Sequence, residues 1–424
     1  MKNLYLLLFL VCCSLQGEAV TLTDCLQIAR RHNNKIEKAK EQILYAQAQK
    51  RQNLSVLLPR FDIDGRYEMK NKSQDYSVFT EFGSSFSAKT IGMNSTFLIF
   101  DFFSAWNGYK ANRVEESISR KNLEKVFVEL DNEVALAYFQ VLENISSLQV
   151  MEDSINSLQK QLDSVEKSVK EGIASKKDLI MLKLLIAEQK KFFLKANTDA
   201  LQSRMHLNHF LGKDPLSELE ITNNFDSYPK YSLQQLRQKA LSNNLDIQIL
   251  KEKIEALQYS VKSSSNKNAP NIYLFGAYYY LEDSPPPETP KNKENRNWIS
   301  GGLGLKFPLY DGGSNSAETK KRKSMLNQSK IELAERSKTV VMEVTEKYLQ
   351  SVELEKKFII EDEIIQMRND ALNSANEKYG LGLAGVDAVL SAQKELVSAK
   401  LQKNKSLFHF HTNFAAIKAL IEKN

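Results

Sequence analysis

Residues 22–36 read LTDCLQIARRHNNKI, and residues 233–247 read LQQLRQKALSNNLDI. The two stretches share a leucine, an alanine, an asparagine and an isoleucine at matching positions. The correspondence continues along the chain, to within one residue of register, in a series of pairs: Pro59 and Pro270, Gly65 and Gly276, Asp101 and Asp311, Tyr138 and Tyr348, Gly172 and Gly382. A repeat of this length far exceeds the roughly 20–50 residues of a solenoid unit. The chain therefore consists of two copies of one large unit.

The beginning of the 424-residue chain has the pattern of a secretory signal peptide. Lys2 provides a positive start, residues 4–13 are apolar, and residues 17–19 read GEA, a small-residue cleavage site. We therefore expect residues 1–19 to be removed on export. Only Cys25 would then remain, so no disulfide can form within the mature chain.

Composition and motifs disfavour several classes of protein. The net charge of +6 is spread along the chain, which gives no nucleic-acid patch, and no stretch after the leader reaches the roughly 18 apolar residues of a membrane helix. Neither Cys12 nor Cys13 follows a small residue, which disfavours a lipid anchor. We find no nucleophile motif, P-loop or dinucleotide fingerprint. The sequence thus predicts neither an enzyme nor a cofactor.

Four segments alternate between apolar and polar residues with the two-residue period of a β-strand: 60–70, 88–100, 271–281 and 298–310. The polar face of the first segment carries charged residues: Asp62, Asp64, Arg66 and Glu68. Alternation over about ten residues, with aromatic residues near the strand ends, is typical of membrane β-barrel strands. We expect two barrel hairpins whose charged face lines a lumen.

The rest of each copy has helical periodicity. We expect repeat 1 at residues 20–211, a linker at 212–231 and repeat 2 at 232–424. The expected helices are 22–57, 104–171 and 176–211 in repeat 1, and 233–262, 316–379 and 386–421 in repeat 2. Apolar residues recur every seventh position from Phe127 to Val169, which indicates a coiled-coil seam. A helix of this length reaches roughly 100 Å and would serve as a spacer.

Four strands cannot close a membrane barrel. An open sheet edge in lipid leaves backbone N–H and C=O groups unpaired, and the smallest membrane barrels have about eight strands. The chain must therefore oligomerise, and a barrel of about twelve strands with a polar lumen would pass solutes.

The mature chain resembles the TolC-like outer membrane efflux proteins in this doubled plan and in two motifs. FPLYDGG at 307–313 resembles the family's strand-to-helix junction, with Pro308, Asp311, Gly312 and Gly313, and residues 379–393 resemble its periplasmic tip. The resemblance implies a mainly α homotrimer, with a 12-stranded β-barrel in the outer membrane of a Gram-negative bacterium continued by a long α-helical barrel in the periplasm. It also implies a periplasmic adaptor (membrane fusion) protein and an inner-membrane RND or ABC transporter as partners.

The resemblance assigns residues to the periplasmic gate. Asp178 and Tyr379 match an aspartate and a tyrosine of the network that holds the closed end. The family's arginine latch and its two constriction aspartates fall on Ala384, Ala388 and Ser391, so both features differ here. Asp387, one position away, either faces the bore, where three like charges would favour cations, or caps the returning helix. The tip turns and adaptor docking are assigned to six residues: Gly172, Ile173, Gly380, Leu381, Gly382 and Leu383.

The function that these inferences predict is an efflux channel for drugs or other toxic small molecules. Two alternatives stay open: an outer-membrane duct for ABC-type peptide or protein secretion, and a periplasmic coiled-coil scaffold that forms no channel. The apolar strand faces argue against the scaffold, since a soluble hairpin would leave them exposed. Two pairs of histidines are closely spaced, His206 with His209 and His409 with His411, but no acid or cysteine in ligand spacing accompanies them, so we expect no metal site.

Overall fold

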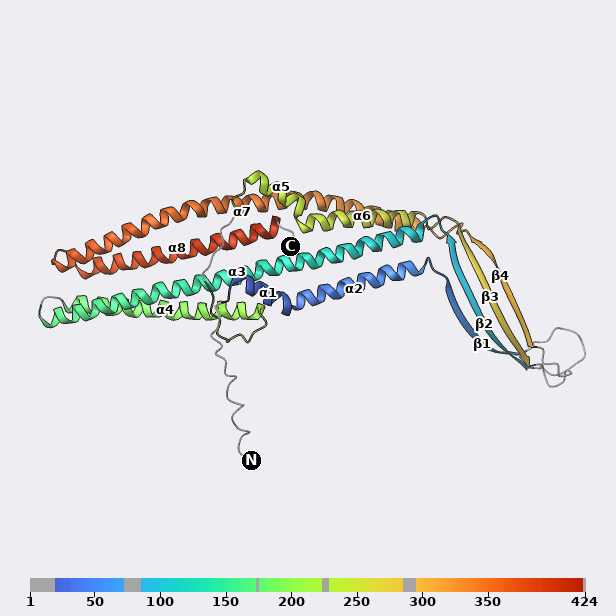
Figure 1. The fold of residues 1–424 in the computed structure, drawn as a ribbon, viewed down its shortest axis with the longest axis horizontal. Coiled ribbons are helices and arrows are strands. Elements are labelled where there is room, and N and C mark those ends of the chain that lie inside the picture. The colour runs from blue at the N-terminus through green and yellow to red at the C-terminus, as the bar shows by residue number, and fades with distance from the viewer. Residues whose placement is uncertain (1–19, 72–84, 173–174, 223–228, 285–294, 422–424) are drawn as a thin grey trace, which may run out of the picture. The chain divides into compact units, whose positions relative to one another are not determined.

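The computed structural model describes residues 20–71, 85–172, 175–222, 229–284 and 295–421 (Figure 1). The expected signal peptide and Ile173 lie outside these ranges. The chain divides into a helical unit, made of Met1–Ala39, Leu123–Gln248 and Arg336–Asn424, and a sheet unit, made of Lys40–Asn122 and Ile249–Glu335. Each unit draws on both sequence repeats, so the compact units are not the repeats themselves.

The sheet unit contains four antiparallel strands in the order β1-β2-β3-β4 (Figure 1). They are β1 (Arg60–Asn71), β2 (Ser85–Phe100), β3 (Asn271–Ser284) and β4 (Asn295–Lys306). Strand β4 ends four residues before the expected boundary at 310, because Pro308 has no N–H to donate to a neighbouring strand. The sheet joins the two repeats through β2 and β3, and within the described ranges both edge strands, β1 and β4, have one side without a strand partner.

The register places one apolar residue from each strand in a row across the sheet. Ile63 lies opposite Met93, Met93 opposite Tyr278, and Tyr278 opposite Ile299. Their exposed fractions are 78%, 48%, 43% and 82%. Because side chains alternate between the two faces, the charged residues of β1 lie on the other face. One face of the sheet is thus apolar and uncovered.

Two expected helices are interrupted at an asparagine. The first consists of α1 (Leu22–His32) and α2 (Asn34–Ser55), separated by Asn33, and the second of α5 (Leu233–Asn243) and α6 (Leu245–Ser265), separated by Asn244. Both asparagines have extended ψ angles of 120° and 124°. The Oδ1 of Asn33 accepts from the Lys35 N–H at 2.8 Å, and that of Asn244 from the Asp246 N–H at 3.1 Å. Each asparagine ends one helix and caps the next, so the predictions of single helices at 22–57 and 233–262 were wrong.

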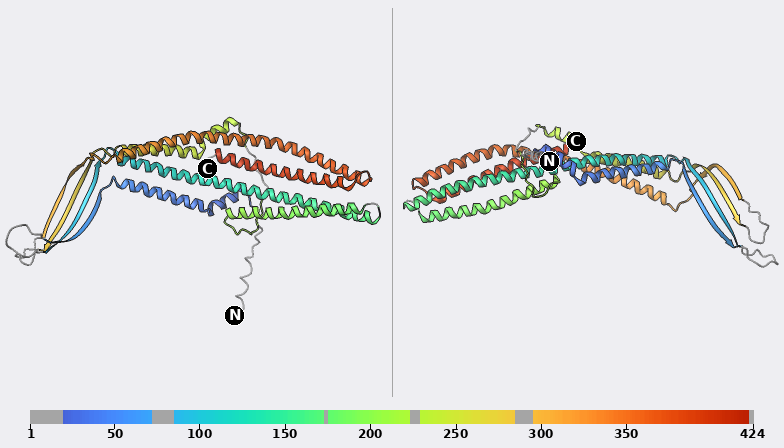
Figure 2. Two further views of the ribbon diagram at one scale, coloured as in Figure 1. Left: turned by 180° about the vertical axis from the view of Figure 1, so that it is seen from behind. Right: turned by 60° about the horizontal axis from the view of Figure 1, so that its bottom comes forward.

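Four long helices complete the chain: α3 (Ser104–Lys170), α4 (Lys176–Phe210), α7 (Ser314–Gly380) and α8 (Val386–Ile421). Within the helical unit α4 lies beside the C-terminal half of α3, and α8 beside that of α7 (Figure 2). Lys183 of α4 pairs with Glu166 of α3 at 2.9 Å, and the Ser406 hydroxyl of α8 donates to Glu361 of α7 at 2.8 Å. No helix in the described ranges is both long and apolar enough to cross a bilayer.

The main core of the helical unit surrounds Tyr138 on α3, which is 1% exposed. Cys25 and Ala29 of α1, Leu207 of α4 and Phe408 of α8 belong to the same cluster. The Tyr138 hydroxyl donates to the carbonyl of Thr222 at 2.7 Å and so fixes the segment after α4. Helices of both repeats therefore pack into one core.

Candidate functional site

The two tip turns use glycine in the left-handed region. Gly172 has φ +77° and Gly382 has φ +72°, which side chains with a Cβ adopt only at a cost. After α7 the Leu383 N–H donates to the carbonyl of Lys378 at 2.8 Å, and the Gly382 N–H to that of Tyr379 at 3.0 Å. This is the hydrogen-bonding pattern of a glycine C-cap, which lets the chain reverse into α8.

The structure brings Tyr379 and Asp178 together at these tips. An apolar cluster joins Leu158 and Val165 of α3, Leu182 of α4 and Val386 of α8, with Tyr379 packed against it. Burial raises the pKa of the Tyr379 hydroxyl, and the negative charge of Asp178 raises it further. Two residues from different repeats thus share one electrostatic environment.

Asp387 lies exposed in the first turn of α8. Its carboxylate folds back over Gly385, where an added Cβ would collide with Oδ1. Ala388 and Ser391 are exposed as well, whereas Val386 is buried in the tip cluster. The exposed face of α8 therefore carries one acid followed by two small uncharged side chains.

The tip after α7 also carries two uncovered apolar residues, Leu381 and Leu383. Gly380 is the last residue of α7, and a Cβ added there would meet no other side chain within 4 Å. The two leucines follow directly from a turn fixed by backbone hydrogen bonds, so their side chains project from a defined position.

The strand-to-helix junction after β4 is organised by Asp311. Its carboxylate accepts from the Gly313 N–H at 3.0 Å and from the Asn315 N–H at 2.9 Å, which caps α7. Gly312 and Gly313 have φ +69° and +83°. Pro308 precedes the turn. The FPLYDGG motif thus terminates a strand and starts a long helix within seven residues.

The expected lumen residues lie on the polar face of β1. Arg60 pairs with Asp62 at 3.0 Å, and Arg66 pairs with Glu68 at 3.2 Å. Asp64 accepts from Asn94 of β2, whose Oδ1 in turn accepts from the Tyr279 hydroxyl of β3 at 2.7 Å. A hydrogen-bonded row therefore crosses three strands on this face.

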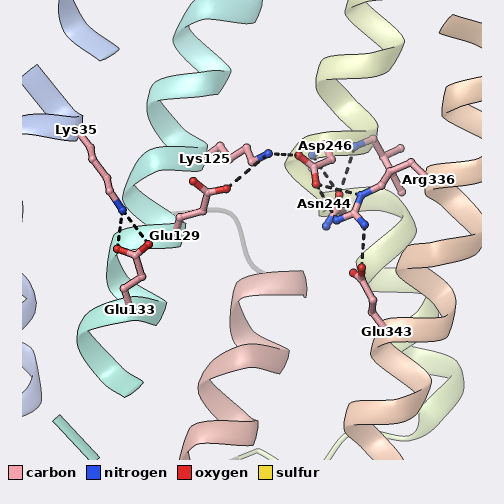
Figure 3. A network of polar contacts seen from close by, with 9 residues as sticks. Lys35, Lys125, Glu129, Glu133, Asn244, Asp246, Arg336 and Glu343 are labelled. Atoms are coloured by element: carbon pink, nitrogen blue, oxygen red, sulfur yellow. Dashed lines mark hydrogen bonds and ion pairs between the residues drawn. The ribbon is translucent and has the colours of Figure 1, made fainter. Parts of the chain in front are cut away.

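A polar network in the helical unit connects three helices (Figure 3). Asp246, at the start of α6, pairs with Lys125 of α3 at 2.6 Å and with Arg336 of α7 at 2.8 Å. Arg336 also pairs with Glu343 at 2.9 Å. Burial alone would raise the pKa of Asp246, but the two cations lower it on balance. Sequence reasoning missed this network, because its members come from distant segments.

Sequence reasoning also missed two stripes of exposed apolar residues. On α4 they are Ile180, Leu184, Leu194, Leu201 and Met205. On α7 they are Met342, Leu349, Ile360 and Met367. The steps between successive residues are 4, 10, 7 and 4 on α4 and 7, 11 and 7 on α7, and such spacings keep each set on one face of its helix, as in a helix-packing seam. That spacing is visible in the sequence, but it does not show whether a neighbour within the chain covers the seam.

The histidines do not gather into a ligand set. His411 is buried and stacks on Phe139 with ring centroids 5.2 Å apart, and burial lowers its pKa to about 4. In the parts of the chain that the structure describes, no group of three or more His, Cys, Asp or Glu residues is placed to hold a metal ion.

Comparison with known proteins identifies the family. A model of the outer membrane efflux protein family matches residues 25–213 and 236–421. Outer membrane efflux protein BepC of Brucella suis biovar 1 (strain 1330) is 21% identical over 314 residues, which are 74% of this chain and 67% of BepC.

Solved structures have the same fold. CusC superposes with a TM-score of 0.84 at 17% identity, covering 95% of this chain and 92% of that chain. The Campylobacter jejuni CmeC outer membrane channel gives a TM-score of 0.81 at 16% identity, covering 94% and 85%. These matches confirm the expected TolC-like fold. The chain belongs to the outer membrane efflux protein family and is an outer-membrane channel protein, which excludes an enzyme and a periplasmic scaffold.

Proposed function

We propose that three copies of this chain form the outer-membrane channel of a tripartite efflux system. The observation that carries the proposal is the four-stranded sheet: in the described part of the chain, nothing covers its apolar face and no strand pairs with its two outer edges. Pairing β1 of one copy with β4 of the next satisfies these edges and gives twelve strands in three copies. The polar face of β1, with Asp62, Asp64, Arg66 and Glu68, then lines the lumen.

The helical unit supports the same assembly. Among the residues that the structure describes, none buries the apolar stripes on α4 and α7. Packing α4 of one copy against α7 of the next covers both seams, as knobs fit into holes in a coiled coil. A further copy of the chain, related by rotation, would therefore pair with the sheet edges and also bury the apolar helix stripes.

The native mass of the detergent-extracted protein, corrected for bound detergent, tests the assembly. We expect a trimer. Leu201→Glu places a charge in the α4 stripe and should reduce the trimer fraction, whereas Gln202→Glu, at the adjacent exposed position outside the stripe, should leave it unchanged. A monomer or dimer for the unmodified protein would overturn the proposal, and equal effects of the two variants would remove α4 from the interface.

The gate and docking assignments are part of this proposal. Tyr379, packed against the apolar cluster at the tips, and Asp178, whose charge acts on it, close the periplasmic end, and Asp387 adds a charge near the bore. The exposed Leu381 and Leu383 dock a periplasmic adaptor that joins the channel to an inner-membrane RND or ABC pump. In this proposal, the duplicated units are repeat 1 at 20–211 and repeat 2 at 232–424, and residues 212–231 form the linker between them.

We infer that the cargo is small molecules, since BepC is named an efflux protein. Disrupting the gene should raise susceptibility to several unrelated toxic compounds, and Leu381→Asp should reproduce this effect without loss of outer-membrane trimer. Unchanged susceptibility with loss of an exported peptide or protein would favour the secretion duct instead.

A further inference from the structure

One row of residues crosses the sheet from its first strand to its last. Asp64 of β1 lies opposite Gly92 of β2, and Gly92 lies opposite Tyr279 of β3. Tyr279 in turn lies opposite Trp298 of β4. Because side chains alternate between the two faces, the whole row lies on the face that carries the charged residues of β1. This face therefore presents a carboxylate and two aromatic rings in one line.

Gly92 leaves the space that the carboxylate and the first ring occupy. A Cβ added at this glycine would lie 2.6 Å from Cε1 of Tyr279 and 2.9 Å from Oδ1 of Asp64, so both groups border the same gap. The Tyr279 ring stacks on that of Trp298, with ring centroids 5.2 Å apart and planes inclined at 26°. Trp298 nevertheless remains 45% exposed. The row thus runs from a carboxylate to an aromatic surface that is open to solvent.

Asp64 differs from the other acids of β1 because no cation pairs with it. The other two acids on this face pair with arginines of the same strand at 3.0 and 3.2 Å. In the part of the chain that the structure describes, the Asp64 carboxylate accepts only from Nδ2 of Asn94. The Oδ1 of Asn94 is itself engaged, since it accepts from the Tyr279 hydroxyl at 2.7 Å. These hydrogen bonds hold the carboxylate and the ring in place, and they leave the negative charge without a counter-charge.

The chemistry of this row matches that of an aromatic organic cation. A carboxylate attracts a positive charge, and so does the face of a tyrosine or tryptophan ring within about 6 Å of its centroid. A divalent metal ion would need several oxygen ligands, whereas the row offers a single carboxylate. An anion would meet the charge of Asp64 and no cation in the row. A flat cation can place its charge beside Asp64 and its ring against Trp298.

We propose that Asp64, Tyr279 and Trp298 form a binding site for aromatic organic cations on the wall of the channel, one site in each copy. This inference rests on the proposed function, because the site faces the lumen only if the sheet closes into a barrel. It names a class of cargo that the channel wall binds during passage: flat aromatic compounds with a permanent positive charge. Gly92 acts as a positioning residue, since it leaves room for the carboxylate and the ring.

Isothermal titration calorimetry of the detergent-extracted protein tests the site with three probes that share a benzene ring. They are the cation benzyltrimethylammonium, the neutral benzyl alcohol and the anion benzenesulfonate. Asp64→Asn removes the charge of the site. Asp62→Asn is the matched control, because it removes the same charge from a paired acid on the same face. The native mass of each sample is measured before the titration.

We expect saturable binding of the cation and none of the other two probes. Asp64→Asn should weaken binding of the cation roughly tenfold, because the carboxylate charge is lost. Asp62→Asn should weaken it at most about twofold, since that charge is already paired and exposed. Trp106→Phe leaves Trp298 as the single tryptophan of the chain, and its emission should change over the same range of cation concentration.

Equal weakening by the two asparagine variants would overturn the site, because the cation would then respond only to the net charge of the face. Equal binding of the three probes would overturn it as well. Loss of the trimer in Asp64→Asn with unchanged affinity for the cation would assign Asp64 to a contact between copies instead. A native mass below that of a trimer for the unmodified protein would contradict the proposed barrel, whereas Asp64-dependent binding in that sample would still support the site.

Discussion

The junction after β2 and the junction after β4 follow the same backbone course with different residues. Asp101 accepts from the Ala105 N–H at 2.6 Å, as Asp311 accepts from the Asn315 N–H at 2.9 Å. Both turns pass through two residues at positive φ: Phe102 and Phe103 after β2, and Gly312 and Gly313 after β4. Only the second uses glycine there, so the duplicated unit keeps its backbone conformation and its cap while its side chains diverge.

The same contrast appears at the helix breaks. Asn33 and Asn244 both end one helix and cap the next, yet the residue two positions later is Lys35 in one repeat and Asp246 in the other. Lys35 pairs with Glu133 at 2.8 Å, whereas Asp246 joins two cations. Backbone signals are thus shared between the repeats, and each repeat has its own side-chain partners.

The largest difference should appear at the matched tyrosines Tyr138 and Tyr348. Tyr138 is buried and hydrogen-bonded, whereas Tyr348 is half-buried. We expect Tyr138→Ala to lower the free energy of unfolding by about 3–5 kcal/mol, because removal of a buried aromatic side chain leaves a cavity. Tyr348→Ala should cost about 1 kcal/mol. Guanidinium unfolding of the detergent-extracted protein measures both, and equal losses would contradict the difference in burial.

Glu116 should make stability depend on acid pH. Lys50 and then Arg120 lower its pKa to about 2, and Leu326 stands at the matching position of repeat 2. Since the folded pKa lies below the unfolded value, ionised Glu116 stabilises the fold above about pH 4.5, and this contribution is lost as the pH falls toward 2. The loss should amount to roughly 2–3 kcal/mol.

Unfolding measured between neutral and acid pH checks this expectation. Glu116→Gln should be less stable at neutral pH and should lose the part of the acid dependence that this group causes. Glu332→Gln, at an exposed pair with Lys253, serves as the control and should change the free energy of unfolding by at most about 0.5 kcal/mol. If the free energy of unfolding of Glu116→Gln falls with acid pH as steeply as that of the unmodified protein, other groups cause this fall.

Substitutions two residues after the helix breaks, at Asp246 and Lys35, should lower the free energy of unfolding by different amounts in the two repeats. Asp246→Lys leaves Lys125 and Arg336 facing a third cation, so we expect a loss of about 1–2 kcal/mol, as the group is only partly buried. Lys35→Ala removes a more exposed pair and should cost at most about 0.5 kcal/mol. Thermal unfolding at low and high salt measures both losses. A larger loss for Lys35→Ala than for Asp246→Lys would contradict the expected difference between the two pairs.

The smallest effect should come from making one junction resemble the other. Gly313→Phe places a side chain where no atom lies within 4 Å of the new Cβ, so the cost is that of the left-handed backbone alone, about 1 kcal/mol. Thermal unfolding in detergent measures it. A several-fold larger loss would mean that a neighbouring copy occupies this space in the assembly.

Sequence reasoning predicted the elements with strong local signals. Alternation gave the four strands, and Gly172 and Gly382 marked the tip turns that the structure shows at positive φ. It failed at Asn33 and Asn244, because a single capping residue inside a helical pattern hardly disturbs the periodicity. It also gave no indication of Phe102, since phenylalanine is not a residue expected at positive φ.

The candidate site was predictable only in part. The junction motif around Asp311 is local, so its cap follows from the sequence. The proximity of Tyr379 to Asp178 was expected only from resemblance to the family, because helices of both repeats must pack before these residues meet. Whether Asp387 faces a bore depends on further copies of the chain, and no pattern within one chain contains that information.

The pairing of β2 with β3 has a consequence for how this channel is made. The two strands are neighbours in the sheet, but α3, α4, α5 and α6 lie between them in the chain. Contacts between distant segments form slowly, because a long loop must close before any pairing stabilises it. The first hairpin must therefore wait, with the β2 edge unpaired, until about two thirds of the polypeptide, up to the end of β3 at Ser284, has been exported. During biogenesis, the first hairpin must therefore be kept from aggregating in the aqueous periplasm until β3 is available to pair with it.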